Sequence, residues 1–188
     1  MSATTATELE LADLYARLET LEQAQSKRVE QKNKLTIVAW GGDLDRIWPT
    51  LILSTTAAAS GMEVTVFFTF WGLFALVKEG VRVTGGNWMQ KGLSIMNPGN
   101  PAKAKLSKLH FAGAGDRMLK KLAKDYGTPQ PVELLETARD LGVRLIPCQM
   151  TMDLMGLTTD DLIDGLAEPI GAATALLEMK EASISLFI

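Results

Sequence analysis

Short apolar runs rich in β-branched and aromatic residues recur along the chain, each bounded by glycine, proline or small polar residues. Runs of this length and composition are typical of strands buried in a sheet. The strands predicted in this way are 35–40, 63–70, 143–147, 168–170 and 183–188.

Segments between these runs carry apolar residues at helical spacing. The predicted helices are one that carries Pro49 early and runs to about residue 60, then 71–78, 116–126, 131–141, a short helix after Cys148, 159–166 and 172–182. Because strands that alternate with helices pair in parallel through right-handed crossovers, the fold class is α/β. We expect a single domain with a mostly parallel sheet of about five strands flanked by helices.

A different pattern precedes the first strand. Leu11, Leu14, Leu18 and Leu21 recur at alternating spacings of three and four, which predicts an amphipathic, heptad-like helix over about 7–30. We therefore divide the chain into this helix with a disordered start (1–33, of which 1–6 are small and polar) and an α/β domain (34–188). About two heptads are too few for a stable isolated coiled coil, so the leucines must pack on copies of themselves, which we favour, or on the parent domain.

Residues 81–105 interrupt the rhythm with glycines and with the motif Asn97-Pro98-Gly99. A long irregular insertion inside a compact domain is usually a binding loop or an interface. We expect 81–101 to shape the entrance of a site.

Composition narrows the function classes. The 188 residues are 47% hydrophobic and carry a net charge of −3. This charge gives no general electrostatic attraction to nucleic acid or acidic lipid. We interpret the lysines and arginines of 103–124 as a solvated face. The longest apolar stretch, 64–77, is too short to span a bilayer. With one cysteine there is neither an intramolecular disulfide nor a zinc site built on two thiolates, and no secretory signal opens the chain, so cytoplasmic localisation is expected.

Cys148, the only cysteine, follows the predicted strand 143–147 and precedes a helix. In an open α/β sheet the carboxyl ends of the strands border the ligand crevice, and helix N-terminal N–H groups favour thiolate over thiol. We therefore expect a reactive thiol near the crevice surface. The alternative is a small, buried, inert hydrophobic side chain.

The neighbours of Cys148 allow two interpretations each. Met150, Met152 and Met155 either fill an irregular core or, in the case of Met152, shield the sulfur from water. Asp153 either bonds to nearby backbone donors or takes part in the site. The only histidine, His110, is a weak candidate for a general base, because a structural imidazole is the commoner role.

Gly41-Gly42-Asp43 follows the first predicted strand, where a phosphate loop could lie. The sequence matches neither the dinucleotide fingerprint nor the P-loop pattern, and Gly113-Ala114-Gly115-Asp116 is no closer. Tight turns explain both segments, and nucleotide or coenzyme A binding stays an alternative.

Three segments of the chain point beyond its composition. They are Ile146-Pro147-Cys148-Gln149-Met150-Thr151-Met152-Asp153-Leu154-Met155-Gly156, the upstream Asn97-Pro98-Gly99, and Ser185-Leu186-Phe187-Ile188 at the end. Together they resemble the DsrE/DsrF-like family, in particular the branch labelled peroxiredoxin-like or DsrE-type sulfurtransferase. The resemblance covers about 34–188. It implies a small parallel α/β domain that forms homo-oligomers in the cytoplasm, a persulfide on Cys148, and TusA-like or rhodanese-like partners in a sulfur relay.

Our sequence-based hypothesis is a sulfur carrier or sulfurtransferase component without a cofactor, with Cys148 as the catalytic residue. The expected substrate-binding residues are Gln149, Met150, Met152, Asp153, Gly41, Gly42 and Asp43, with the backbone amides of Gln149 and Met150 stabilising the charge on sulfur. Peroxide reduction is disfavoured because the chain has no resolving cysteine of its own. The alternative is a non-catalytic oligomeric binding module in which Cys148 is inert.

Overall fold

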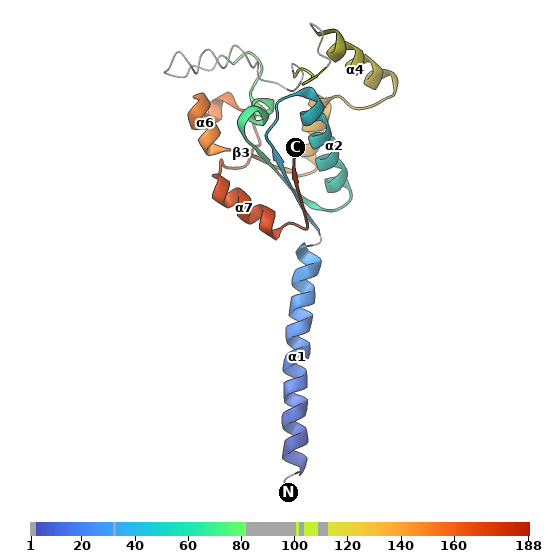
Figure 1. Ribbon diagram of the computed structural model, residues 1–188, viewed down its shortest axis with the longest axis vertical. Coiled ribbons are helices and arrows are strands. Elements are labelled where there is room, and N and C mark those ends of the chain that lie inside the picture. Colours follow the sequence, from blue (N-terminus) through green and yellow to red (C-terminus); the bar gives the residue numbers. More distant parts are fainter. Residues whose placement is uncertain (1–2, 32, 82–100, 102–103, 109–112) are drawn as a thin grey trace.

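The molecule is built around one parallel sheet. The structure is a computed structural model and describes residues 3–31, 33–81, 101, 104–108 and 113–188 (Figure 1). Four strands pair in the order β3-β2-β1-β4. They are β1 (Lys34–Ala39), β2 (Glu63–Phe68), β3 (Arg144–Pro147) and β4 (Ile184–Phe187), and every pairing is parallel. The predicted α/β class is confirmed.

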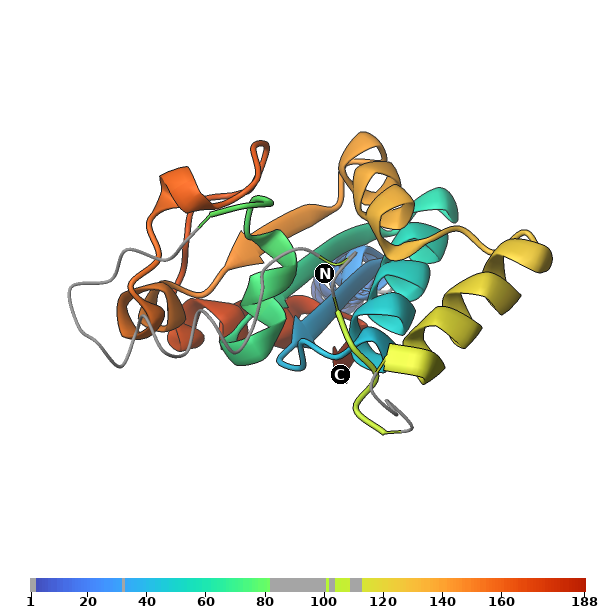
Figure 2. The same cartoon turned by 90° about the horizontal axis from the view of Figure 1, so that it is seen from above.

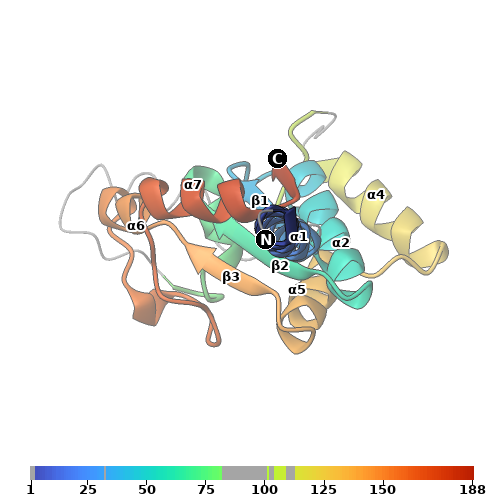
Figure 3. The ribbon, with the colours of Figure 1, turned by 90° about the horizontal axis from the view of Figure 1, so that it is seen from below.

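Helices cover both faces of this sheet. On one face lie α2 (Leu44–Ala59) and α5 (Pro131–Asp140), and α7 (Ala172–Glu181) lies on the other (Figure 3). Beside α2, on the side away from the sheet, is α4 (Ala114–Asp125) (Figure 2). The short helix α6 (Gln149–Met155) follows β3, and two 3₁₀ turns, η1 (Phe70–Leu76) and η4 (Thr159–Asp161), complete the described elements.

Alternation along the strands divides the buried side chains into two clusters. The larger cluster lies on the α2 and α5 face and includes Ile37, Val66 and Leu145. The residues that follow each of these point the other way. Val38, Phe67, Ile146 and Cys148 form the smaller cluster with Ala175 of α7. Cys148 therefore belongs to the face that α7 covers.

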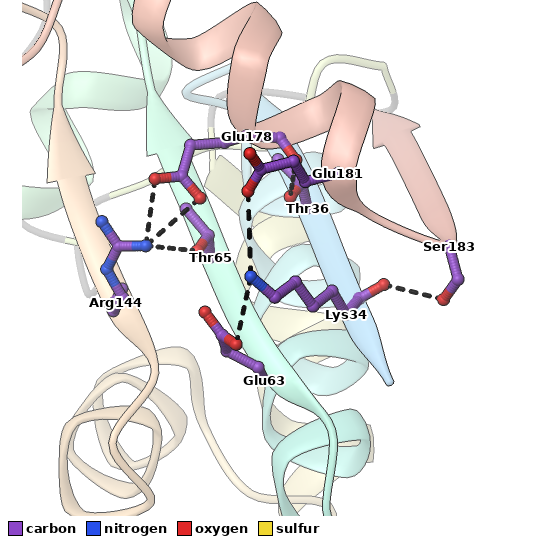
Figure 4. A network of polar contacts seen from close by, with 8 residues as sticks. All are labelled: Lys34, Thr36, Glu63, Thr65, Arg144, Glu178, Glu181 and Ser183. Carbon is purple, nitrogen blue, oxygen red and sulfur yellow. Dashed lines mark hydrogen bonds and ion pairs between the residues drawn. The ribbon is translucent and has the colours of Figure 1, made fainter. Parts of the chain in front are cut away.

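Polar contacts hold α7 across the strands (Figure 4). Arg144 of β3 donates to both carboxylate oxygens of Glu178, at 3.1 and 3.2 Å, and the Thr36 hydroxyl of β1 donates to the Glu178 carbonyl at 3.3 Å. Lys34 Nζ lies 3.4 Å from Glu63 and 3.9 Å from Glu181. The carboxyl-terminal half of α7 is thus tied to β1 and β3, which fixes the helix over the smaller cluster.

The N-terminal helix α1 (Ala3–Gln31) extends away from the rest of the molecule (Figure 1). Every residue from 11 to 26 is exposed. For this stretch the alternative that the leucines pack on the parent domain is wrong. The helix also begins at Ala3, so that 3–6, which we expected to be disordered, lie within it.

The structure departs from the sequence prediction at three further elements. The predicted fifth strand, 168–170, is a single parallel bridge between Cys148 and Ile170. The predicted helix 159–166 is only the turn η4, because Gly165 adopts a left-handed φ of 78° that a helix does not allow. The predicted helix 71–78 is the 3₁₀ element η1, which ends at Leu76. Most of the expected entrance loop 81–101, including Asn97-Pro98-Gly99, lies outside the described residues.

Candidate functional site

The carboxyl ends of the four strands meet at one edge of the sheet, as parallel pairing requires. Hydrogen bonds join the residues that come directly after the strands at this edge. Trp40 N–H donates to the Ile188 carbonyl at 2.9 Å, and Thr69 N–H donates to the Ala39 carbonyl at 3.0 Å. Cys148 N–H donates to the Phe68 carbonyl at 2.9 Å. Cys148 is the N-cap residue of α6, so its predicted position between a strand end and a helix start is confirmed.

The side chain of Cys148 is 1% exposed. It packs among Val38, Phe67, Ile146 and Ala175. The expectation that the sulfur lies near the crevice surface is wrong for the single chain, because α7 crosses this face and covers it. A reactive group carried by another protein can therefore reach the thiol only if α6 or α7 moves.

Two backbone hydrogen bonds join the residues on either side of Cys148 to Ile170. Gln149 N–H donates to the Ile170 carbonyl at 3.0 Å, and Ile170 N–H donates to the Pro147 carbonyl at 3.1 Å. The Gln149 N–H, which we expected to stabilise the charge on the sulfur, thus donates to a backbone carbonyl in this conformation. The Met150 N–H belongs to the first turn of α6, where N–H groups lack acceptors within the helix.

The other predicted residues of α6 separate into a surface group and a core residue. Gln149 Nε2 donates to Asp153 Oδ1 at 2.8 Å on the exposed side of the helix. Met150 is 55% exposed, whereas Met152 is 2% exposed and packs in the larger cluster. Met152 and Cys148 thus belong to different clusters, and core filling explains Met152 better than shielding of the sulfur.

Thr151 is a site residue that the sequence analysis did not select. Its hydroxyl is buried, lies 3.1 Å from the Thr69 hydroxyl, and accepts a hydrogen bond from Phe70 N–H at 3.1 Å. Phe70 has φ of 46°, a left-handed conformation that a bulky residue rarely adopts. Thr151 therefore couples α6 to a strained residue two positions after the end of β2. No local pattern distinguishes this threonine from an ordinary helical one.

Gly41 and Gly42 allow close packing at the end of β1. A Cβ on Gly41 would lie 2.0 Å from Arg46 Cδ, and one on Gly42 would lie 2.5 Å from the Trp71 carbonyl oxygen. The Arg46 guanidinium lies 4.1 Å from the centre of the Trp40 ring. The Arg46 side chain thus occupies the space beside Gly41, which supports the interpretation as a tight turn.

The two carboxylates after this turn have opposite pKa shifts. Partial burial, aided by the negative charge of Asp45, raises the pKa of Asp43 although Arg46 opposes the shift. Partial burial would also raise the pKa of Asp45, but hydrogen bonds from the Ser107 hydroxyl and N–H, together with Arg46, outweigh it and lower that pKa. Asp45 therefore anchors the segment 104–108 to the start of α2.

Cys148 lines neither of two cavities on the described part of the surface. A groove of about 770 Å³ lies along α4 and is bordered by Leu106, Met118, Leu122 and two lysines, Lys108 and Lys121, among others. A smaller cavity of about 240 Å³ lies between Pro147 and residues 159–169. His110 lies outside the described residues.

Comparison with known proteins gives a consistent result. The model of the DsrE/DsrF/DrsH-like family matches residues 31–187. The uncharacterized protein YrkE of Bacillus subtilis (strain 168) is 39% identical over 159 residues, which are 85% of this chain and 99% of that protein. The sulfur carrier protein DsrE2 of Allochromatium vinosum is 37% identical over 170 residues, covering 85% of this chain and 100% of that protein.

The fold also has a solved counterpart. The ychN protein of E. coli matches with a TM-score of 0.50 and 17% sequence identity, over 83% of this chain and 99% of that chain. At this identity the likeness shows the fold alone.

Proposed function

Because the chain belongs to the DsrE/DsrF/DrsH-like family, we propose that it is a sulfur carrier that holds sulfane sulfur as a persulfide on Cys148 and relays it to a partner protein. The observation that carries the proposal is the position of the chain's only cysteine, at the junction of β3 and α6 on the carboxyl edge of the sheet. The relative named as a sulfur carrier supports the sulfur-relay role.

The proposed chemistry needs a single thiol. The Cys148 thiolate attacks the outer sulfur of a donor persulfide, a new sulfur–sulfur bond forms, and the donor leaves as a thiolate. In the second step an acceptor thiolate attacks the outer sulfur of the Cys148 persulfide and Cys148 leaves as a thiolate. No net oxidation occurs in either exchange, so no cofactor is required.

Burial of the sulfur adds a gating step to this cycle. The amino-terminal half of α7 rests on the cysteine through Ala175, while its carboxyl-terminal half is tied to the strands by Glu178. Opening at the segment around Ile170 and Gly171 would expose the sulfur without breaking those ties. Such local opening populates a minor state, and the transfer rate falls in proportion to that population.

Intact-protein mass spectrometry tests the proposal. After incubation with a sulfane donor, the wild-type chain should gain about 32 Da, the mass of one sulfur atom expected from simple exchange. The variant Cys148→Ser should gain none under the same conditions. Equal mass gains in the two proteins would contradict a persulfide on Cys148.

The burial of Cys148 also favours a second candidate, a non-catalytic oligomeric binding module in which the thiol is inert. The two candidates differ in the accessibility of the sulfur. A carrier should react with a small thiol probe at neutral pH in the native state. Labelling that occurs only after the whole domain unfolds would favour the binding module.

The remaining parts of the proposal concern partners and location. We propose that the protein forms homo-oligomers, that it exchanges sulfur with TusA-like or rhodanese-like proteins, and that it is located in the cytoplasm. These assignments rest on the family and on the sulfur carrier relative. Within the described residues, no helix combines the length and apolar character needed to cross a membrane.

A further inference from the structure

Helix α1 carries an apolar face that no described residue of its own chain covers. Leu11, Leu14, Leu18 and Leu21 are 52%, 63%, 47% and 65% exposed. Their 3-4-3 spacing places them in one stripe along the helix, the arrangement of the a and d positions of a coiled coil. Four leucines in one exposed stripe form a contact surface, because isolated exposed leucines would not keep this spacing.

Charges beside the stripe indicate what fits it. With Leu11 and Leu18 at a positions, Arg17 occupies a g position and Glu22 the e position of the next heptad. In a parallel, in-register coiled coil, a g residue of one helix lies beside the following e residue of the other. Arg17 then faces Glu22 of the second copy, and the reciprocal pair has the same signs. In an antiparallel arrangement g faces g and e faces e, so this pairing is lost.

We infer that α1 forms a parallel, in-register coiled coil with α1 of further copies of this chain. The Arg17 guanidinium now pairs with Asp13 of its own helix at 3.0 Å, on a fully solvated surface, and is free to turn toward the partner. The inference concerns assembly and does not depend on the sulfur chemistry proposed above.

The assembly would orient the α/β domains in one direction. α1 joins β1 at the amino end of the strand, whereas Cys148 lies at the carboxyl edge of the sheet (Figure 1). A parallel coiled coil therefore places the domains together at one end, with their carboxyl edges turned away from the helices. Because the apolar stripe spans only about two heptads, association is expected to be reversible and concentration dependent.

Light scattering on the full chain over a dilution series tests this assembly. The wild-type protein should have a mass above the 20.4 kDa of one chain, decreasing on dilution. The double variant Leu14→Glu/Leu18→Glu should have a lower mass at every concentration. Its matched control is Ala16→Glu/Gln23→Glu, which adds the same two negative charges on the opposite side of the helix and should behave as wild type. An unchanged mass in Leu14→Glu/Leu18→Glu would overturn the inference.

A charge exchange tests the orientation. Arg17→Glu and Glu22→Arg each place like charges together and should raise the dissociation constant about 3- to 10-fold at low salt, from the modest size of exposed charge pairs. The combined variant Arg17→Glu/Glu22→Arg restores opposite charges only in the parallel register and should recover wild-type association. Failure to recover, with helix content unchanged by circular dichroism, would rule out the parallel arrangement.

Discussion

At the scale of single residues, buried hydroxyl contacts hold α6, the helix that begins directly after Cys148. Thr151 bonds to both Thr69 and the backbone of Phe70, and so joins α6 to the end of β2. The left-handed φ of Phe70 stores strain that these bonds must offset. Loss of the Thr151 hydroxyl should therefore make local opening more frequent.

We predict that Thr151→Val increases the rate at which a small thiol probe labels Cys148 in the native protein by about 10-fold. A net loss of about 1.4 kcal/mol from two buried hydrogen bonds corresponds to that factor. Stopped-flow labelling measures this rate under conditions where local opening comes to equilibrium before the probe reacts. Thr137→Val is the control, since its hydroxyl bonds only within α5. An unaltered labelling rate in Thr151→Val would show that α6 does not gate the sulfur.

Asp43 provides a pH-dependent prediction. Because burial raises its pKa above 3.8, the folded state binds the proton more tightly than the unfolded chain, and the stability that this provides is lost as pH rises through the folded pKa. At neutral pH the charged Asp43 thus opposes folding. Asp43→Asn keeps a good N-cap residue and should increase the unfolding free energy by at most about 0.5 kcal/mol, because solvent screens a group this exposed.

Denaturant unfolding at two pH values checks the Asp43 prediction. The difference between Asp43→Asn and wild type should appear at neutral pH and vanish well below pH 3.8, where the wild-type carboxyl is protonated in both states. A difference that is the same at both pH values would mean that charge is not its cause.

At the scale of elements, η1 approaches the end of β1 so closely that a glycine is required at position 72. Gly72 N–H donates to the Trp40 carbonyl at 3.1 Å, and a Cβ on Gly72 would lie 2.1 Å from the Ala39 carbonyl oxygen. Both atoms of the clash belong to or are fixed to the backbone, so neither yields easily. This contact positions η1 beside the carboxyl edge of the sheet.

We predict that Gly72→Ala lowers the free energy of unfolding by about 2 kcal/mol or more, the range of steric strain at special backbone positions. Gly171→Ala is the matched control, because a Cβ there would meet nothing within 4 Å and its φ of −87° suits alanine. Chemical denaturation of both variants gives the comparison. Equal effects of the two substitutions would contradict the close approach.

At the scale of the whole molecule, the helix proposed for assembly and the cysteine proposed to carry sulfur lie at opposite ends of the sheet. The heptad helix enters at the amino edge of the sheet, and Cys148 stands at the carboxyl edge. Two functions placed this far apart on a parallel sheet should be separable by mutation.

We therefore predict that Leu14→Glu/Leu18→Glu reduces the assembly mass and leaves persulfide uptake by Cys148 at the wild-type level. The measurement is the mass gain after a sulfane donor, taken at a concentration where wild type is assembled and the variant is not. Loss of uptake in the variant would mean that a neighbouring copy completes the site.

Local features were predictable from the sequence because their causes are local. The four strands, the helices that flank them and the strand-to-helix position of Cys148 follow from apolar runs ended by glycine or proline. The strand predicted at 168–170 does not form, because Pro169 and the short span allow only the bridge at Ile170. The predicted helix 159–166 failed because η4 ends at Asp161 and Gly165 takes a left-handed φ.

Contacts between distant segments decided the rest. The sequence by itself determined a parallel α/β domain, a heptad helix before it and one cysteine at a strand end, since spacing and residue type encode these directly. Only the tertiary structure decided that Ala175 buries the sulfur, that Ile170 occupies the Gln149 amide and that α1 lies apart from its domain. Each of these depends on which surfaces meet when the chain closes, and side-chain packing over long sequence separations leaves no periodic signal.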